Sequence, residues 1–299
     1  MGGSKDSLKL VKTLKQLGKL VLLVDKNQEC ICKKLADLFI CYSIWDHENI
    51  IDQIKDLQIA ISLTRSSGYA SVSCIKINNF LGLTEMTSEI AESLINKEKI
   101  YDSGINNIVN LPKKITYSNH KLIPDSYFPL IIKPALEKMG KLTTYKITNL
   151  DSINISYENA KKNSITNTVI CQKYISGFDI SLIGYAIDNR YKYPVLLKEE
   201  NSFKENGNIV HSGFILHENS SLKKELVRIA NNIVRKFYIN FSPLNLSFRI
   251  SDNQIYLVEI NLDFGGEGIL EYIESKLEID HIKHLIENFL HSNKKSINI

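Results

Sequence analysis

The amino-acid sequence predicts an α/β protein, α+β in its carboxy-terminal part, with a doubly wound α/β domain at its amino terminus. Residues 5–17 place leucine and valine at helical spacing, and Gly18 follows them at the position of a helix-ending glycine. Residues 20–24 are a continuous apolar run closed by Asp25, which is typical of a buried parallel strand. Residues 244–260 hold two alternating runs joined by a Ser-Asp-Asn turn, which predicts an antiparallel hairpin.

The same patterns divide the chain into four segments. Residues 1–83 alternate helical and strand signals and form the expected α/β domain, 84–111 are connecting helices, and 112–176 and 177–299 are rich in strands. Further strands are expected at 38–42, 58–63, 130–133, 169–172, 179–187 and 193–198, and helices within 151–167 and at 222–238.

Composition narrows the class of protein. Hydrophobic residues make up 43% of the 299 residues and charged residues 23%, which is ordinary for a globular chain. The net charge of +4 is spread without a basic cluster, which argues against nucleic-acid binding. No apolar stretch is long enough to cross a membrane, and the first residues lack the apolar core of a signal peptide. We therefore expect a cytoplasmic protein whose five cysteines are free thiols.

The amino terminus lacks an element that its pattern requires. Gly2, Gly3 and Ser4 resemble the turn after a first strand, but only Met1 precedes them. We expect either an apolar strand from a natural start further upstream or a homodimer that shields this region, because unpaired strand edges are a liability. The alternative is that residues 20–24 form the edge of the sheet and are covered by a helix.

Glu259 and Asn261 are the strongest candidates for a metal site. They stand two apart in the second strand of the hairpin, so both side chains point to one face of the sheet. A carboxylate and an amide oxygen side by side suit Mg²⁺. The alternative is a polar pair that faces solvent on an edge strand.

Two further stretches carry groups that suit a nucleotide. Residues 172–179 place an amide and a backbone edge at a strand end, then a turn at Gly177 and a carboxylate at Asp179. This order can present hydrogen-bonding groups to a purine and then to ribose hydroxyls, although an ordinary strand corner has the same pattern. Lys133 ends the apolar strand at 130–133, where a buried cation needs an anion such as phosphate unless it reaches water.

In this order and at this separation, these stretches resemble the ATP-grasp superfamily, especially its carboxylate–amine ligases, over nearly the whole chain. The amino-terminal motifs that agree are Gly3-x-x-x-Ser7-Leu8, Asp25-Lys26-Asn27, Leu35-Ala36-Asp37, Ile44-Trp45-Asp46, Thr64-Arg65-Ser66-Ser67-Gly68, Leu81-Gly82-Leu83 and Asn96-Lys97-Glu98-Lys99. The resemblance implies an ATP-grasp fold in which 112–176 is the small lid subdomain and 177–299 is the carboxy-terminal catalytic subdomain.

The resemblance also implies which residues bind ATP. Lys97 and Lys133 match the two lysines that hold the phosphates, and Gln172 stands where relatives have a glutamate that faces the adenine amino group. Ile175 matches the position whose backbone contacts the adenine edge, and Asp179 replaces a ribose-binding glutamate. The expected ATP-binding residues are Lys97, Lys133, Gln172, Lys173, Ile175, Asp179 and Lys198; the expected catalytic residues are Lys133, Glu259 and Asn261, of which the last two hold Mg²⁺.

Several positions depart from the family pattern. Ser247 occupies the place of the first metal ligand, and Asp263 that of an arginine that steadies the transferred phosphoryl group. The phosphate flap has one glycine; either Lys138 and Lys141 replace backbone amides with side-chain charge, or the flap has lost its function. Lys198 is either a further phosphate contact or a solvated lysine at a strand end.

The resemblance implies an enzyme that uses ATP and Mg²⁺ to join a small-molecule carboxylate to an amine through an acyl phosphate, with release of ADP and phosphate. Two other functions remain open: a nucleotide-binding homologue without turnover, and an ATP-grasp kinase. His211 is a candidate substrate contact, although a structural role ranks ahead of it. For His281 and His284, on the terminal helix, a solvated helix face is a simpler interpretation than a metal site.

Overall fold

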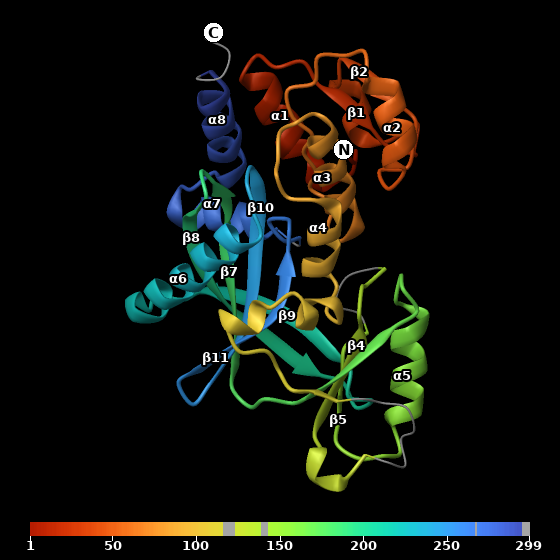
Figure 1. The fold of residues 1–299 in the computed structure, drawn as a ribbon, viewed down its shortest axis with the longest axis vertical. Helices are drawn as coiled ribbons and strands as arrows, with labels where there is room; N and C mark the ends of the chain where they lie inside the picture. The colour runs from red at the N-terminus through yellow and green to blue at the C-terminus, as the bar shows by residue number, and fades with distance from the viewer. Residues whose placement is uncertain (116–122, 139–142, 267, 295–299) are drawn as a thin grey trace.

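The computed structural model describes residues 1–115, 123–138, 143–266 and 268–294. The strands in these ranges form sheets of two, four and five strands, and the strands of each sheet are consecutive in the sequence. In Figure 1 the amino-terminal part and the four-stranded sheet lie at opposite ends of the long axis, with the five-stranded sheet between them. This arrangement confirms the predicted mixture of helices and sheets, and the boundaries proposed after residues 83, 111 and 176 fall between the sheets.

The amino-terminal part is built on a short parallel sheet. β1 (Leu22–Val24) pairs with β2 (Leu38–Ile40), and the surrounding helices are α1 (Leu8–Gln16), α2 (His47–Ile54) and α3 (Tyr69–Phe80), with 3-10 turns at Lys5–Ser7 and Ile31–Leu35. The helix predicted at 5–17 and the strands predicted at 20–24 and 38–42 are confirmed, with shorter strands. The strand predicted at 58–63 is wrong, because no neighbouring strand among the described residues forms a ladder with it.

The edge of β1 opposite β2 borders an apolar cavity of about 500 Å³. Residues 18–24 line one side of it and residues 57–63 another, and α8 (His281–Lys294) adds Leu285, Ile286, Phe289 and Leu290. In the part of the chain that the structure describes, no strand lies between these two segments. Among the described residues, β1 therefore stands at the edge of its sheet with α8 on the far side of the cavity, as the alternative expectation has it, and an upstream strand or a second copy of the chain at this edge stays a prediction.

Met1 and Gly2 connect the two segments that line this cavity. The Gly2 N–H donates to the Val24 carbonyl over 2.9 Å, and the Met1 ammonium donates to the Leu63 carbonyl over 2.6 Å. The two residues therefore bridge the segments as a strand would. Burial lowers the pKa of the Met1 ammonium, because an apolar surrounding disfavours the charged form.

The four-stranded sheet has the order β3-β6-β4-β5 and is antiparallel. Its strands are β3 (Lys114–Ile115), β4 (Leu130–Pro134), β5 (Tyr145–Ile147) and β6 (Val169–Lys173), with a 3-10 turn at Asp125–Tyr127 before β4. α5 (Ile153–Lys162) covers one face of this sheet and buries Ile153 and Ala160 (Figure 1). The strands predicted at 130–133 and 169–172, and the helix predicted within 151–167, are confirmed.

The five-stranded sheet has the order β11-β10-β7-β8-β9 and is also antiparallel. Its elements are β7 (Phe178–Ile187), β8 (Arg190–Phe203), β9 (Ile209–Leu216), α6 (Ser220–Lys236), β10 (Ser242–Ser251), β11 (Gln254–Asn261) and α7 (Ile269–Leu277), followed by α8. The predicted hairpin at 244–260 and the predicted helix at 222–238 are confirmed. Among the described residues, no helix has the length and apolar character needed to cross a membrane.

Both faces of this sheet are buried along much of their length. On one face, Leu182 and Leu246 pack with α3, α6 and α4 (Ser88–Ile95). On the other face, Ile183 and Tyr185 pack with α1, α7 and α8. Two 3-10 turns, Lys99–Asp102 and Ile105–Asn107, carry the chain from α4 toward the four-stranded sheet. Burial on both sides explains why β7 is apolar from Leu182 to its end, apart from Gly184.

The cavity beside β1 predicts how the protein responds to an added strand. We expect five apolar β-branched residues joined to Met1 to raise the melting temperature by several degrees. Each side chain that fills the cavity contributes about 1.5–3 kcal/mol, part of which offsets the entropy of ordering the strand, and an amide replaces the buried ammonium of Met1. Calorimetric melting tests this, with a Gly-Ser extension of equal length as control. Equal melting temperatures for the two extensions would contradict the assignment of the cavity to a strand.

Candidate active site

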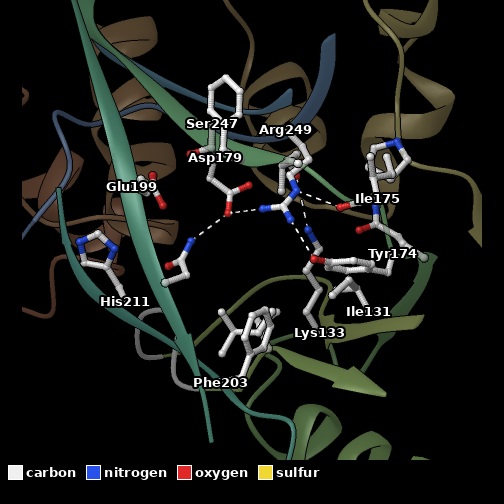
Figure 2. A pocket seen from close by; sticks show the side chains of 18 of the residues that line it. Ile131, Lys133, Tyr174, Ile175, Asp179, Glu199, Phe203, His211, Ser247 and Arg249 are labelled. Atoms are coloured by element: carbon white, nitrogen blue, oxygen red, sulfur yellow. Dashed lines mark hydrogen bonds and ion pairs between the residues drawn. The ribbon is translucent and has the colours of Figure 1, made fainter. Parts of the chain in front are cut away.

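A cavity of about 620 Å³, here called the large cavity, lies between the four-stranded and five-stranded sheets (Figure 2). Its lining includes Ile131 and Lys133 of β4, Gln172 and Lys173 of β6, Tyr174 and Ile175 of the following linker, Asp179 of β7, Lys198 and Glu199 of β8, His211 of β9, and Ser247 and Arg249 of β10. Six of the seven residues expected to bind ATP therefore meet here. The seventh, Lys97, lines a second cavity.

The linker between β6 and β7 approaches β10 closely at Gly177. The φ angle of Gly177 is +136°, and a Cβ there would lie 1.9 Å from the carbonyl oxygen of Ile250. Only glycine therefore fits at this position. Earlier in the linker, the Tyr174 N–H donates to the Pro129 carbonyl over 3.0 Å. These two contacts tie the linker to both sheets and place Ile175 at the wall of the large cavity.

Arg249 connects the linker to Asp179 (Figure 2). Its Nη1 donates to Asp179 Oδ2 over 2.8 Å, its Nε donates to the Ile175 carbonyl over 2.9 Å, and its Nη2 donates to the Tyr174 hydroxyl over 3.0 Å. The Asn201 amide donates to the same Asp179 oxygen over 2.8 Å. The carboxylate expected to bind ribose is therefore held in one orientation. Sequence reasoning missed Arg249.

Gln172 is oriented by Tyr101. The Tyr101 hydroxyl donates to the Pro112 carbonyl over 2.5 Å, and Gln172 Nε2 donates to the Tyr101 hydroxyl over 2.6 Å. Burial raises the pKa of Tyr101 to about 12, so the hydroxyl keeps its proton at neutral pH. Because this single proton goes to Pro112, the hydroxyl accepts from Gln172, which fixes the amide with Oε1 turned away from Tyr101. That oxygen is then able to accept from an adenine amino group.

A second cavity of about 250 Å³, here called the small cavity, adjoins the large one, because Glu199 and His211 line both. Its other lining residues include Trp45, Ser67, Gly68 and Tyr69 of the amino-terminal part, and Lys97, Glu137, Lys138, Asn245, Glu259, Asn261 and Asp263. The small cavity therefore lies where the amino-terminal part meets the five-stranded sheet.

Lys97 and Glu259 form a buried ion pair beside the small cavity. Lys97 is 6% exposed, its Nζ lies 2.9 Å from Glu259 Oε1, and Glu137 lies 3.6 Å from the same ammonium. Lys133, also buried, donates to the Val258 carbonyl over 3.5 Å. The two lysines that the resemblance assigns to the phosphates therefore both contact β11, where the expected metal pair stands.

The oxygen groups around Glu259 fit a magnesium ion. Glu259 and Asn261 both line the small cavity, and Ser247 is the register partner of Glu259. The Ser247 hydroxyl lies 3.4 Å from that of Ser181, which donates to the Glu199 carboxylate. Glu199, which sequence reasoning missed, thus brings a carboxylate close to the place where Ser247 replaces one. The described residues contain no cluster of three acidic, histidine or cysteine groups, so phosphate oxygens and water would complete such a site.

Asp263 is buried just after β11. Its Oδ1 accepts from the Gly265 N–H over 2.6 Å. Burial raises the pKa of Asp263 to about 6; the Gly265 hydrogen bond and the charge of Arg65 act in the opposite direction, and Glu259 adds to the rise. The arginine expected at this position is thus replaced by a buried acidic group.

The histidines of α8 do not form a solvated face. His281 is 1% exposed, its Nε2 lies 2.8 Å from the Tyr193 carbonyl, and its ring packs against Phe264. The ring of His284 stacks on Tyr193 with centroids 4.3 Å apart. The interpretation of a solvated face is therefore wrong, because both rings belong to the contact between α8 and β8.

The two lysines proposed to assist the phosphate flap differ in what the structure describes. Lys138 lines the small cavity, and its Nζ donates to the Lys162 carbonyl over 2.8 Å. Lys141 lies outside the described residues. Lys138 is therefore the flap lysine that the structure brings to the site.

Solved structures share this architecture. The chain is similar to phosphoribosylglycinamide synthetase from Anaerococcus prevotii, with 17% identity, a TM-score of 0.73, and 97% of this chain and 74% of that chain covered. It is also similar to an L-amino acid ligase from Bacillus licheniformis (14% identity, TM-score 0.75, coverage 94% and 71%). A third neighbour is N5-carboxyaminoimidazole synthetase from Staphylococcus aureus complexed with ADP (15% identity, TM-score 0.75, 95% of this chain and 74% of that chain covered). No protein-family model and no curated protein matches the sequence. At these identities the likeness establishes a shared fold.

The close approach at Gly177 predicts a specific cost of substitution. We expect Gly177→Ala to destabilise the protein by at least about 2 kcal/mol and to weaken binding of a fluorescent ATP analogue, because the new Cβ pushes the linker away from β10. Gly213→Ala on β9 is the control, since a Cβ there meets only Glu200 at 3.5 Å. Urea unfolding measures both variants; equal losses of stability would show that the linker contact is not specific.

The orientation of Gln172 predicts a change in nucleotide preference. In Tyr101→Phe the amide is free to turn its N–H groups toward the oxygen of a guanine, so we expect the preference for ATP over GTP to fall about 2- to 10-fold. Competition binding in the presence of Mg²⁺ measures this ratio. Tyr238→Phe, at an exposed tyrosine, is the control. An unchanged ratio in Tyr101→Phe would remove Tyr101 from this role.

Proposed function

We propose that this chain, which has the ATP-grasp fold, is a Mg²⁺- and ATP-dependent ligase that joins a small-molecule carboxylate to an amine. ATP occupies the large cavity, with its phosphates directed toward Glu259 and Asn261, and the carboxylate and the amine meet in the small cavity. The observation that carries this proposal is that the two cavities adjoin at Glu199 and His211, beside the buried pair of Lys97 and Glu259.

The solved neighbours support the same type of reaction. They are named as synthetases and a ligase, and one of them was solved with ADP. A carboxylase domain from Hydrogenobacter thermophilus, at 12% identity and a TM-score of 0.72, was solved with MgADP and bicarbonate. That neighbour therefore binds a magnesium nucleotide and a small oxyanion in one structure, and the two cavities here offer room for a nucleotide and a small acid.

The first step in this proposal is transfer of a phosphoryl group. An oxygen of the substrate carboxylate forms a bond to the γ-phosphorus while the bond from the γ-phosphorus to the ADP oxygen breaks, which gives an acyl phosphate and ADP. Lys97 and Lys133 are buried beside β11, and their charges stabilise the phosphate oxygens strongly because little water screens them. Catalysis is mainly positioning and neutralisation of charge.

The carboxylate of Glu259 and the amide of Asn261 would hold Mg²⁺, with Glu199 as a further oxygen donor. When bound, the ion neutralises charge on the terminal phosphates. The protein's part is to keep these donors in place. Lys97 holds the Glu259 carboxylate through an ion pair, and the Ser181 hydroxyl holds the Glu199 carboxylate through a hydrogen bond.

The second step joins the amine to the activated carbonyl. The nitrogen forms a bond to the carbonyl carbon, and the bond from that carbon to the phosphate oxygen breaks. Acyl phosphates hydrolyse readily, so the small cavity has to exclude water while both substrates are bound. Its walls come from all four segments of the chain and include Trp45 and Lys138, and its volume of about 250 Å³ leaves room for small substrates only.

A nucleotide-binding protein without turnover is the second candidate, because Ser247 lacks the carboxylate expected of the first metal ligand. Glu199 weighs against it, since its carboxylate is linked to Ser247 through Ser181. An ATP-grasp kinase differs from both in its products. Release of ADP and phosphate only when an acid and an amine are both supplied identifies the ligase.

Glu259 gives the most direct test of the proposed reaction. We expect Glu259→Gln to lower ADP release on the order of 100-fold or more, because the variant keeps the shape of the side chain but loses the charge that holds the metal. ADP release over a panel of amino acids and short peptides measures the loss, and circular dichroism confirms the fold. Glu218→Gln, at an exposed position before α6, is the control. Normal turnover by Glu259→Gln would reject the site assignment.

A further inference from the structure

The small cavity contains two buried acceptors for which the described residues supply no donor. Asp263 is 3% exposed, and its Oδ2 has no hydrogen-bond partner in the part of the chain that the structure describes. Asn245 is 6% exposed, and its Oδ1 likewise has none among the described residues. Both residues line the small cavity. Buried polar atoms are nearly always hydrogen-bonded, so a ligand that donates to both acceptors is expected here.

The two acceptors belong to one end of the small cavity. Asn245 on β10 is the register partner of Asn261, the last residue of β11, and Asp263 follows two residues later. A Cβ at Gly265 would lie 3.4 Å from Asn245 Nδ2, and the N–H of the same glycine donates to Asp263. The turn at Gly265 therefore brings the amide and the carboxylate together.

The charge of the small cavity favours a cation. Four carboxylates line it, together with two lysines. One of these lysines, Lys97, is already paired with Glu259 and Glu137. Arg65 opposes the charge of Asp263 but does not line the small cavity. In the proposed function Glu199 and Glu259 hold Mg²⁺, so Asp263 is the lining carboxylate that is left for a ligand cation at this end; the ion pairs of the described residues include none to it.

Two aromatic side chains that line the same cavity favour an organic cation over a second metal ion. The rings of Trp45 and Tyr69 pack edge to face, with their centroids 6.1 Å apart, and both residues line the small cavity. Aromatic rings attract ammonium groups and pack on alkyl chains. A primary ammonium carries three N–H donors and can satisfy both free acceptors at once, whereas Mg²⁺ requires near-octahedral oxygen coordination.

We infer that the small cavity binds the amine substrate as a primary ammonium, with Asp263 Oδ2 and Asn245 Oδ1 accepting its N–H groups and Trp45 and Tyr69 packing on its organic part. This inference rests on the proposed function and names the class of its second substrate. The ammonium gives up one proton to bulk solvent before the acyl phosphate forms and water is excluded, and the neutral nitrogen then bonds to the carbonyl carbon. When the C–O bond to phosphate breaks, the second proton goes to the departing phosphate.

Calorimetric titration tests the ammonium site directly. The probes are alkylamines from methylamine to hexylamine and the L-amino acid amides, each compared with its N-acetyl form, in the presence of Mg²⁺ and a non-hydrolysable ATP analogue. We expect the protein to bind at least one amine and no N-acetyl form. Asp263→Asn keeps an oxygen for the Gly265 N–H and should weaken amine binding at least tenfold, while affinity for the ATP analogue stays within twofold. Asp252→Asn, in the exposed turn between β10 and β11, should change neither affinity.

A second variant covers the case in which Asp263→Asn fails to fold. Trp45 is 46% exposed, so Trp45→Ala should fold and should weaken binding of the longer amines more than that of methylamine. The inference is overturned if no amine binds the unmodified protein, or if both variants bind amines as it does. A metal titration identifies the other occupant. If the unmodified protein binds no amine but binds a second Mn²⁺ that Asp263→Asn does not bind, the site holds a metal ion and the inference is overturned.

ADP release with the same amines separates this inference from the proposed function. If amines bind, Asp263→Asn weakens their binding and no ADP is released, the ligase is rejected and the ammonium site is supported. ADP release with an amine KM that Asp263→Asn leaves unchanged supports the ligase and rejects the ammonium site. A raised amine KM at an unchanged KM for ATP supports both.

Discussion

One face of the five-stranded sheet changes from apolar to polar along its strands, and the whole site depends on this change. Ile183 and Tyr185 of β7 pack under α7 and α8, whereas Asp179 and Ser181, on the same face, lie at the cavities. The neighbouring strands repeat the pattern, since Ser247 pairs in register with both Ser181 and Glu259. A slip of one residue would turn these polar groups into the apolar core, so the register that buries the core also assembles the site.

Burial then decides which of these polar groups are available to a ligand. Arg249 satisfies Asp179 in a partly exposed ion pair, and Lys97 satisfies Glu259 in a buried ion pair that water screens little. Removing one partner of the buried pair would leave a charge uncompensated, so Lys97 and Glu259 have to be buried together. Asp179 at the large cavity and Glu259 at the small cavity therefore already have partners. Asp263 and Asn245 differ, because they bring acceptors to the small cavity for which the described chain supplies no donor.

The sequence predicted those parts of the structure that depend on local pattern. The pair Glu259 and Asn261 followed from the two-residue period of a strand, and Lys133 followed from its place at the end of an apolar run. Arg249 and Glu199 were missed because their roles depend on which strands lie side by side, and register is not visible in one strand alone. Tyr101 was missed for the same reason, since it reaches Gln172 across 71 positions of the chain. The strand expected at 58–63 failed because apolar residues form a ladder only where another strand lies beside them.

Two of the departures from the family pattern, at Ser247 and Asp263, have a common chemical explanation once the strands are placed. Ser247 is too short to replace a carboxylate, but Glu199 of β8 reaches the same neighbourhood through the hydroxyl of Ser181. Asp263 stands where a cation was expected, yet Lys97 and Lys133 already bring two cations to β11. A third cation there would add to charge that these lysines supply, whereas a carboxylate past the end of β11 can serve a positively charged substrate. In the function proposed here, the negative charge of Asp263 therefore serves to bind the amine. Lys97 and Lys133 supply the positive charge for the phosphoryl transfer, so residues are present for both steps.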